Sequence, residues 1–402
     1  MQADVRAQVR AGVVERFETW QVPLLERLVA QPSCTRAPAD VEAAARLLDA
    51  EAESLGLSCE VHPDPAGRVA AHRVYRAPSL GAEGRGLALV GHIDTVFPRS
   101  MGFLAFQRDG DVVRGPGVLD MKSGLCAMFG AWAALRAACP EAASRLAARW
   151  IVVSDEETGS PSSADLYRRL SPLISEALVF EAGRTEDRIV TRRRGSGVWT
   201  LHAKGRASHA GNAHAQGINA IHALALLVPR IEAMTDHARG RTLNVGLFEG
   251  GTAKNTVPER ASLGIDGRFG SSEDEEAIVR GLERLVRDPF AGLQGVPDRL
   301  RQVEFTLEGR VSRPPMEATD ATQALRARYE QVAAECGLGT GEAPLQGGGS
   351  DANLLAAHGV PCIDGLGPFG RHFHETEEWS SLDSLRRRTE ALALFLLDAA
   401  VG

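Results

Sequence analysis

Short runs of consecutive apolar residues alternate with longer amphipathic stretches through the first half of the chain. Four of these runs are typical of buried strands, and they cover residues 68–72, 87–90, 150–153 and 178–180. The clearest helical stretch between them is 122–138. Strands that are apolar at nearly every position and alternate with helices indicate a mostly parallel sheet covered by helices on both faces. We therefore predict an α/β fold for this part of the chain.

Two helices are expected before the first of these strands. Residues 5–30 form an amphipathic pattern, and residues 41–55 carry an apolar stripe at helical spacing. Asp40 is suited to cap the start of the second helix, and Gly56 is suited to follow its end.

The pattern changes near residue 192, where alternating strands replace continuous apolar ones. Strands are expected at 198–203, 242–246, 263–269 and 303–307, with helices at 218–234 and 272–286. The resulting order, β-α-β-β-α-β, is that of a ferredoxin-like α+β domain. We predict that this domain, residues 192–311, is inserted into a larger domain formed by residues 1–191 and 312–402.

The first pattern resumes after the insertion. Helices are expected at 321–335, from Asp351 onward and at 381–399, with a glycine-rich turn at 347–349 and a short apolar strand at 361–363.

Composition narrows the class of protein. The chain has 402 residues, of which 44% are apolar and 24% charged, as in soluble globular proteins. A net charge of −7 with no basic patch excludes a typical nucleic-acid-binding protein. Six scattered cysteines without a C-x-x-C pair indicate reduced core residues. We see no signal peptide and no apolar run near the ~20 residues of a membrane span, so a cytoplasmic protein without a membrane partner is expected.

Potential metal ligands occur at the ends of the predicted strands. Six residues follow predicted strands directly or stand at the start of the next helix: His92, Asp94, Asp120, Glu156, Glu157 and Glu181. In open α/β sheets this edge is where ligands bind. So many carboxylates in one place repel one another unless cations balance them. Imidazole and carboxylate ligands suit zinc or a similar ion, and two such ions can share a carboxylate and a water molecule.

The adjacent glutamates, Glu156 and Glu157, point in different directions and therefore serve different purposes. One of them can bind a metal ion while the other, beside the shared water, acts as a general base.

Five segments that occur in order together resemble a known family. They are Gly-His-Ile-Asp-Thr-Val, Gly-Pro-Gly-Val-Leu-Asp-Met-Lys, Ser-Asp-Glu-Glu-Thr-Gly-Ser, Phe-Glu-Ala-Gly and Gly-Arg-Ala-Ser-His-Ala-Gly. The chain resembles the co-catalytic dizinc metallopeptidase family of glutamate carboxypeptidases (carboxypeptidase G type), acetylornithine deacetylases, succinyl-diaminopimelate desuccinylases and aminoacylases. The resemblance covers roughly residues 20–400 and is strongest to the carboxypeptidase G branch.

The resemblance implies a set of five metal ligands: His92, Asp120, Glu157, Glu181 and His374. Asp120 would bridge two Zn²⁺ ions, for which Co²⁺ or Mn²⁺ are alternatives, and the peptide bond after it would be cis. Glu156 would be the general base, with a metal-bridging water as nucleophile, and Asp94 would support the site from behind His92. His372 competes with His374 for the last position. Ser123 departs from the family, which usually has glycine there.

The resemblance also implies substrate contacts from the inserted domain. His209 would stabilise the oxyanion of the tetrahedral intermediate. In the family this histidine often reaches the active site of the other subunit of a homodimer, which pairs through the inserted domain. Asn255 and Arg268 match positions that bind the substrate carboxylate. Ser350, in the glycine-rich turn, either lines the pocket or caps the following helix.

The function that follows is hydrolysis of an amide or peptide bond to an amino acid with a free carboxylate. We expect a metallocarboxypeptidase acting on a small peptide or N-acyl-amino acid, with C-terminal glutamate as the specific candidate. An N-acyl-amino-acid deacylase or a dipeptidase of the same family is the alternative among hydrolases. The alternatives from other classes are a non-catalytic amino-acid-binding protein and a protein with a single or structural metal ion.

Overall fold

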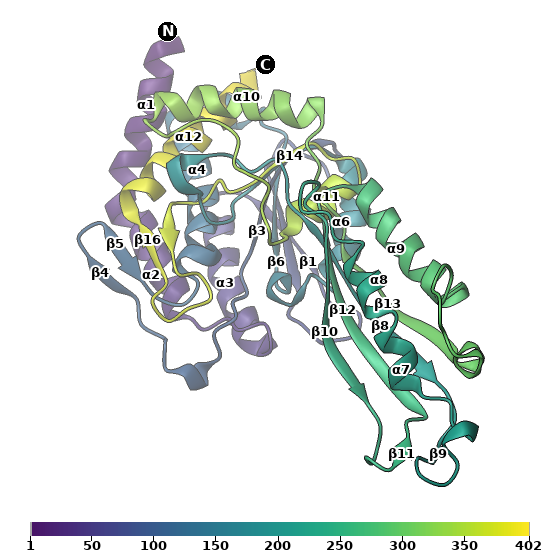
Figure 1. Ribbon diagram of the computed structural model, residues 1–402. Helices are drawn as coiled ribbons and strands as arrows, with labels where there is room; N and C mark the ends of the chain where they lie inside the picture. Colours follow the sequence, from purple (N-terminus) through teal and green to yellow (C-terminus); the bar gives the residue numbers. More distant parts are fainter. Residues whose placement is uncertain (1, 402) are drawn as a thin grey trace. The chain divides into compact units, whose positions relative to one another are not determined.

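The chain forms two compact units in the computed structural model, which describes residues 2–401 (Figure 1). The first unit contains the chain up to Thr191, Ala318–Pro344, and the chain from Ser350 onward. The second contains Arg192–Glu317 and Leu345–Gly349. The first boundary coincides with the expected one. The second unit continues past residue 311 to Glu317 and also takes in the glycine-rich turn, which we had assigned to the larger domain.

The first unit is built on a six-stranded sheet. Its strands, in spatial order, are β1 (Ser58–His62), β2 (His72–Arg76), β6 (Ala148–Val153), β3 (Gly86–His92), β7 (Ile174–Val179) and β14 (Cys362–Ile363). The last four run parallel to one another, whereas β1 and β2 are antiparallel to their neighbours. The prediction of a mostly parallel sheet is confirmed.

The expected strand at 68–72 is wrong. The strand begins only at His72, because a turn closed by the Gly67 amide on the Asp64 carbonyl precedes it and Arg68 donates its amide to the Asp64 carboxylate. Strand β1 was missed because four of its five residues are exposed, so it lacks the apolar pattern of a buried strand.

Helices surround this sheet. They are α1 (Gln2–Arg16), α2 (Val22–Ala30), α3 (Pro38–Ser54), α4 (Ser123–Ala138), α5 (Pro140–Ala143), α6 (Ser163–Leu170), α10 (Asp320–Glu335), α11 (Asp351–Ala357) and α12 (Leu382–Val401). A π-helical turn, Phe17–Gln21, separates α1 from α2 within the expected first helix. Helix α3 starts at Pro38, so Asp40 lies in its first turn instead of capping it, and binds Arg99 at 2.7 Å.

The core helix of the first unit is α4. It packs on β3, and α1 and α12 pack against it in turn. Trp132 of α4 meets Trp150 of β6 edge to face, with ring centroids 5.5 Å apart. By length and composition the stretch Val118–Ala138 could cross a membrane, so our expectation that no run approaches this length was wrong. However, 94% of its apolar window is buried in the fold, as in a core helix.

A small antiparallel sheet brings the C-terminal segment beside the first half of the chain. Its strands, in order, are β15 (Gly370–Arg371), β16 (Trp379–Ser381), β5 (Val112–Arg114) and β4 (Gln107–Asp109). It was not predicted, because its strands have two or three residues each and form only through partners distant in sequence. The segment between β15 and β16 contains His374.

The second unit has the ferredoxin-like arrangement that was expected. Its sheet has the spatial order β10 (Thr242–Gly250), β12 (Arg260–Phe269), β8 (Gly195–Lys204) and β13 (Glu304–Arg313), with all neighbours antiparallel. Helix α9 (Ser272–Arg287) also follows the prediction. The single long helix at 218–234 is wrong, since two short helices, α7 (Ala220–Ala225) and α8 (Val228–Glu232), replace it. Pro229 lies in the first turn of α8, where its missing N–H costs no helical hydrogen bond.

A two-stranded ribbon forms the tip of the second unit (Figure 1). It pairs β9 (Ser208–His209) with β11 (Thr256–Val257). All six cysteines of the chain are free thiols, as expected, although Cys59 is exposed and does not belong to the core.

The contact between α4 and the end of β7 leaves no room for a side chain at Gly124. A Cβ atom there would lie 2.2 Å from the carbonyl oxygen of Phe180. We expect Gly124→Ala to lower the free energy of unfolding by about 1–3 kcal/mol, because backbone must move. Gly12→Ala is the control, since its nearest atom would lie 3.7 Å away and alanine favours a helix. Equal denaturant midpoints for the two variants would contradict this packing.

Candidate functional site

Three neighbouring parallel strands direct polar residues to one edge of the main sheet. His92 is the last residue of β3, Glu181 follows β7, and Glu156 and Glu157 lie in a 3₁₀ turn directly after β6. Because the carboxyl ends of parallel strands share an edge, these side chains converge although they are far apart in sequence.

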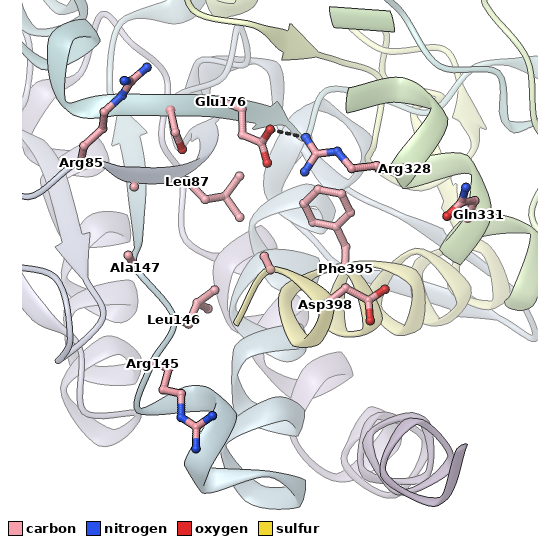
Figure 2. A pocket seen from close by; sticks show the side chains of 13 residues that line it. Arg85, Leu87, Arg145, Leu146, Ala147, Glu176, Arg328, Gln331, Phe395 and Asp398 are labelled. Carbon is pink, nitrogen blue, oxygen red and sulfur yellow. Dashed lines mark hydrogen bonds and ion pairs between the residues drawn. The ribbon is translucent and has the colours of Figure 1, made fainter. Parts of the chain in front are cut away.

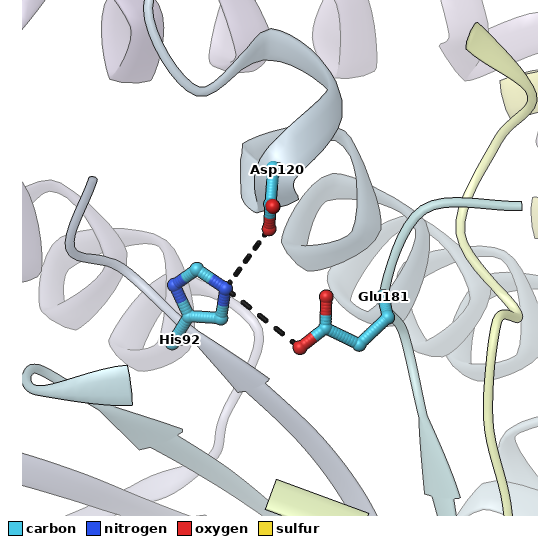
Figure 3. Close-up of side chains that lie close together, drawn as sticks. All are labelled: His92, Asp120 and Glu181. Atoms are coloured by element: carbon cyan, nitrogen blue, oxygen red, sulfur yellow. Dashed lines mark hydrogen bonds and ion pairs between the residues drawn. The ribbon is translucent and has the colours of Figure 1, made fainter. Parts of the chain in front are cut away.

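The first group of potential ligands consists of His92, Asp120 and Glu181 (Figure 3). The Nε2 atom of His92 lies 3.1 Å from Asp120 Oδ1 and 3.9 Å from Glu181 Oε1. Within this group one ligand atom from each residue lies within 4.8 Å of the others.

The second group consists of Asp120, Glu157 and His374. The Nε2 atom of His374 lies 3.4 Å from Asp120 Oδ2 and 3.1 Å from Glu157 Oε2. Between the two candidate histidines of the C-terminal segment, the structure therefore places His374 here. His372 instead has its Nδ1 3.0 Å from a carboxylate oxygen of Glu375.

Asp120 belongs to both groups and turns one oxygen toward each. Oδ1 faces His92 and Oδ2 faces His374, which is the arrangement of a carboxylate that bridges two cations. Imidazole with carboxylate oxygens is a donor set that suits Zn²⁺ and related ions. The residues thus fit a pair of metal ions that share Asp120. Glu156 belongs to neither group.

In the absence of cations, protons balance the charge of this cluster. Hydrogen bonds with Asp120 and Glu157 raise the pKa of His374 to about 10. Burial acts to lower the pKa of His92, but its contacts with Asp120 and Asp94 raise it well above the usual value. Burial, reinforced by Asp120, raises the pKa of Glu181 as well. The metal-free site therefore binds protons that a cation would displace.

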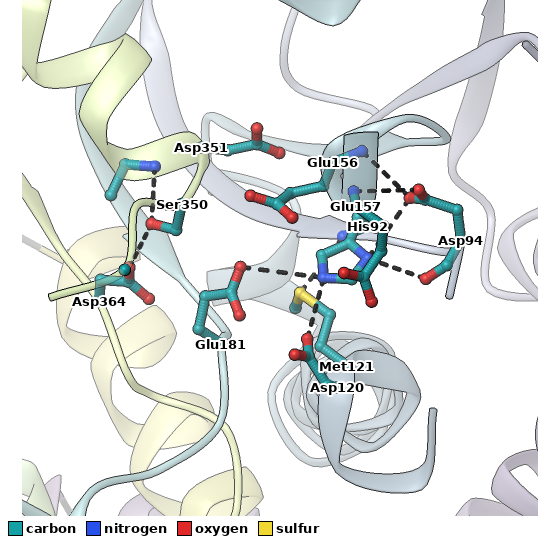
Figure 4. A network of polar contacts seen from close by, with 12 residues as sticks. His92, Asp94, Asp120, Met121, Glu156, Glu157, Glu181, Ser350, Asp351 and Asp364 are labelled. Carbon is teal, nitrogen blue, oxygen red and sulfur yellow. Dashed lines mark hydrogen bonds and ion pairs between the residues drawn. The ribbon is translucent and has the colours of Figure 1, made fainter. Parts of the chain in front are cut away.

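Asp94 connects His92 to the turn that carries the two glutamates (Figure 4). Its carboxylate accepts the main-chain N–H groups of Glu156 and Glu157 at 3.3 and 3.2 Å and the hydroxyl of Thr35 at 2.6 Å. Its carbonyl oxygen lies 3.0 Å from His92 Nδ1. A proton on Nδ1 then leaves Nε2 as the nitrogen that faces Asp120. The sequence did not reveal Thr35, which lies in no motif.

Glu378 holds the main chain of the segment that leads up to Asp120. This buried carboxylate accepts the N–H groups of Gly117, Leu119 and Asp120 at 3.0, 2.7 and 2.9 Å. The Asp120–Met121 peptide bond is cis, as the resemblance implied.

Ser123, where the family usually has glycine, fits this segment. Its buried hydroxyl donates to the carbonyl of Val118, one turn earlier. The substitution thus adds a hydrogen bond to the turn that leads into α4.

Ser350 caps a helix in this structure. Its fully buried hydroxyl accepts the Ala352 amide at the start of α11 and donates to Asp364 at 2.6 Å. Both hydrogen-bonding capacities are thereby used, which favours the capping interpretation over the substrate-binding one for Ser350.

Two of the predicted substrate contacts meet at the tip of the second unit. Asn255 accepts the Ala210 amide on its carbonyl oxygen, next to the β9–β11 pair that includes His209. The Nδ1 atom of His209 accepts the amides of Gly211 and Asn212, both at 3.1 Å. Since Nδ1 is an acceptor, the neutral ring carries its proton on Nε2 and can donate it.

Arg268 lies at the other end of β12. Strand β12 begins at Arg260, near the tip, and at about 3.3 Å per residue the distance to Arg268 is roughly 26 Å. Its guanidinium forms a two-point ion pair with Asp266, with both N–O distances 3.0 Å. The structure therefore does not bring Arg268 together with His209 and Asn255 within one chain.

A surface cavity of about 550 Å³ lies at the opposite edge of the main sheet (Figure 2). Its wall includes Gly86 at the start of β3, whereas the candidate site lies at the end of that strand. Two of its acidic groups are already paired, Glu176 with Arg328 and Asp398 with Arg6. The cavity shares no residue with the predicted site.

Known proteins with similar sequences agree with the metal site that the geometry indicates. Residues 88–398 match Peptidase family M20/M25/M40. Carboxypeptidase G2 of Pseudomonas sp. (strain RS-16) is 28% identical over 407 aligned residues, which cover 98% of this chain and 94% of the relative. A succinyl-diaminopimelate desuccinylase of Magnetococcus marinus is 28% identical over 333 residues, covering 77% of this chain and 82% of the relative.

Solved structures share the fold. The aminopeptidase PepT of Bacillus cereus superposes with a TM-score of 0.76 at 22% identity, over 95% of this chain and 98% of that one. An M20 family metallo-carboxypeptidase of Sulfolobus solfataricus gives a TM-score of 0.70 at 16% identity, over 95% of this chain and all of the other, 100%. With the family match over most of its length, the chain belongs to Peptidase family M20/M25/M40, whose members are metal-dependent hydrolases.

Proposed function

We propose that the protein is a dizinc metallocarboxypeptidase that releases an amino acid with a free carboxylate from a peptide or N-acyl amide. The observation that carries this proposal is Asp120, whose two oxygens face two separate histidine–carboxylate groups while Glu156 stays outside both. The relative named carboxypeptidase G2, aligned over 98% of the chain, supports the carboxypeptidase type. C-terminal glutamate is the specific candidate.

The relatives named succinyl-diaminopimelate desuccinylase favour a second candidate, N-deacylation of an acyl-amino acid. Both reactions hydrolyse an amide whose amine side is an amino acid. They differ only in the group on the acyl side.

Metal ions bound at the two groups, with Co²⁺ or Mn²⁺ as alternatives to Zn²⁺, would polarise the substrate carbonyl and lower the pKa of a water molecule between them. Glu156 accepts the proton of the attacking water and delivers it to the leaving amine. The bond from its amide to Asp94 holds its backbone beside Glu157. His209 donates Nε2–H to the oxyanion, and Arg268 and Asn255 bind the carboxylate of the released amino acid.

The separation inside the second unit supports a homodimer. Strand β12 extends roughly 26 Å from Arg260, near the tip that carries His209 and Asn255, to Arg268, which is too far for one small substrate to touch both ends. A substrate that contacts all of them would take His209 and Asn255 from one subunit and Arg268 from the other. Strand β10 is the last strand of the four-stranded sheet on one side. The amides of Leu243 and Val245 bind the side chains of Thr235 and Glu232, but no further strand pairs with this edge among the described residues, so it offers a place for the subunits to pair.

Replacing the proposed base tests the mechanism. Glu156→Gln keeps the shape of the side chain but cannot accept a proton, so we expect kcat to fall by about 10²–10⁴-fold. The metal content should stay unchanged, because Glu156 is in neither ligand group. Hydrolysis would be followed on N-aroyl-glutamates, dipeptides and N-acyl-amino acids, which also separates the two candidate reactions. Glu377→Gln, an exposed glutamate, is the control.

Wild-type rates on Glu156→Gln would overturn the proposed base. Binding of these compounds by the wild-type protein without turnover would favour the non-catalytic alternative.

Metal uptake should release protons. His374, with a pKa of about 10, holds a proton in the metal-free site at pH 7, and the pKa values of His92 and Glu181 are raised in the same direction. Cations must displace the protons that these groups hold. Titration calorimetry in two buffers of different ionisation enthalpy should show proton release, with affinity rising as pH rises. Elemental analysis should give two metal ions per chain. One ion per chain, or heats independent of the buffer, would contradict the proposal.

Mixing two inactive variants tests the shared site. Glu156→Ala and His209→Ala each damage a different part of it, so a mixed dimer contains one complete site if His209 acts on the other subunit. Random exchange of subunits should then restore about a quarter of wild-type activity. Mixing Glu156→Ala with Glu156→Gln is the control and should restore none. No recovery, in a sample where subunit exchange is shown by mass spectrometry, would place His209 and Glu156 in the same chain.

A further inference from the structure

His72 lies directly behind the turn that carries the two adjacent glutamates, although it belongs to no motif. It is the first residue of β2, next to the end of β6, and only 2% of its surface is exposed. The imidazole lies between Ser154 and Ser162. These serines stand on either side of the segment 155–161, which contains Glu156 and Glu157.

The donor and acceptor roles of this ring can be assigned from its neighbours. Ser154 donates its main-chain N–H to His72 Nδ1 at 3.2 Å, and its hydroxyl donates to the carbonyl of Ala70. Nδ1 is therefore an acceptor, and Nε2 carries the proton and donates it to Ser162 Oγ at 3.2 Å. The hydroxyl of Ser162 in turn donates to Asp64 Oδ1 at 3.1 Å. A neutral His72 satisfies every member of this chain.

The turn itself is held from inside by Asp155. The Asp155 carboxylate accepts the amides of Ser162 and Ser163 at 2.7 and 3.1 Å. Its carbonyl oxygen accepts the amide of Ser160 at 3.0 Å. These bonds close the turn on itself but do not attach it to the sheet. Asp94 holds the amides of Glu156 and Glu157 on one side, and His72 connects both ends of the turn to β2 on the other.

We propose that His72 is a positioning residue that fastens the two ends of this turn and so keeps Glu156 and Glu157 in place for hydrolysis. The catalytic consequence rests on the proposed function, whereas the fastening of the turn does not. His72 touches neither group of potential metal ligands, so it acts through Ser154 and Ser162 alone. The polar groups that face it are the two serines, Asp64, Asp155, Asp94 and His62.

Three substitutions separate the two hydrogen bonds of the ring. His72→Leu removes both. His72→Asn places an oxygen near the position of Nδ1 and can still accept the Ser154 amide, whereas His72→Gln places an N–H₂ group near Nε2 and can still donate to Ser162. His62→Leu is the matched control, because His62 is paired opposite His72 on β1 but its ring lies 3.4 Å from Glu60 instead of the turn.

The first readout is hydrogen exchange of the metal-free protein, which needs no turnover. We expect the peptide covering residues 154–163 to exchange faster in His72→Leu, with intermediate protection in His72→Asn and His72→Gln. The control His62→Leu should match the wild type. If His72→Leu does not fold, the asparagine and glutamine variants still test the order of protection.

The second readout is steady-state kinetics with the substrate that the wild type turns over best. We expect kcat of His72→Leu to fall by about 10–100-fold with KM nearly unchanged, as for other residues that orient a metal site, and each of the two polar variants to recover part of it. Wild-type exchange and wild-type kcat in His72→Leu would overturn the proposal. Faster exchange in a protein whose wild type turns over none of the substrates would leave the fastening intact and overturn the proposed function.

Discussion

The structure of the first unit depends on the electrostatic cost of gathering carboxylates at one edge of a sheet. Asp120, Glu157 and Glu181 converge on two histidines in a largely buried place. Buried carboxylates are unfavourable unless protons, cations or hydrogen bonds compensate them. The pKa values of His92, His374 and Glu181 are raised in this cluster, so in the absence of cations it favours bound protons. The same cluster is therefore poised to exchange protons for metal ions, as expected in a metal-dependent hydrolase family.

The side chains around this cluster act on the main chain more than on the ligands themselves. Asp94 binds the amides of Glu156 and Glu157, and Glu378 binds those of Gly117, Leu119 and Asp120. A carboxylate that accepts several amides fixes the path of a loop as firmly as a short piece of sheet. Since the ligands lie in loops and turns after strands, such anchors give them the precision that the strands alone cannot give.

The second unit separates its polar groups instead of gathering them. Its tip presents His209 with Nε2–H as donor and Asn255 close by, whereas Arg268 stands at the far end of β12 in contact with Asp266. An extended strand cannot fold back to bring its two ends together. This separation is the reason for proposing that His209 and Arg268 act on one substrate from two subunits of a symmetric dimer.

The sequence alone was sufficient to predict those features whose pattern lies within one short segment of the chain. The continuous apolar runs of β3 and β6 predicted the parallel sheet, and the position of polar residues after strand ends indicated the potential metal ligands. The family resemblance then selected His92, Asp120, Glu157 and Glu181 from these candidates, and the structure brings the four together. The ferredoxin-like order was likewise visible from alternation and helical periodicity. These features follow from side-chain periods of two and 3.6, which are properties of the chain itself.

Tertiary structure decided everything that depends on partners distant in sequence. Strand β1 has no apolar pattern and exists because β2 pairs with it. Ser350 caps α11, because its hydroxyl accepts the Ala352 amide while Asp364 fixes its orientation by accepting its proton. His72 is surrounded by polar residues that no motif connects to it. A hydrogen bond between residues far apart along the chain leaves no period in the sequence, so only the folded geometry reveals it.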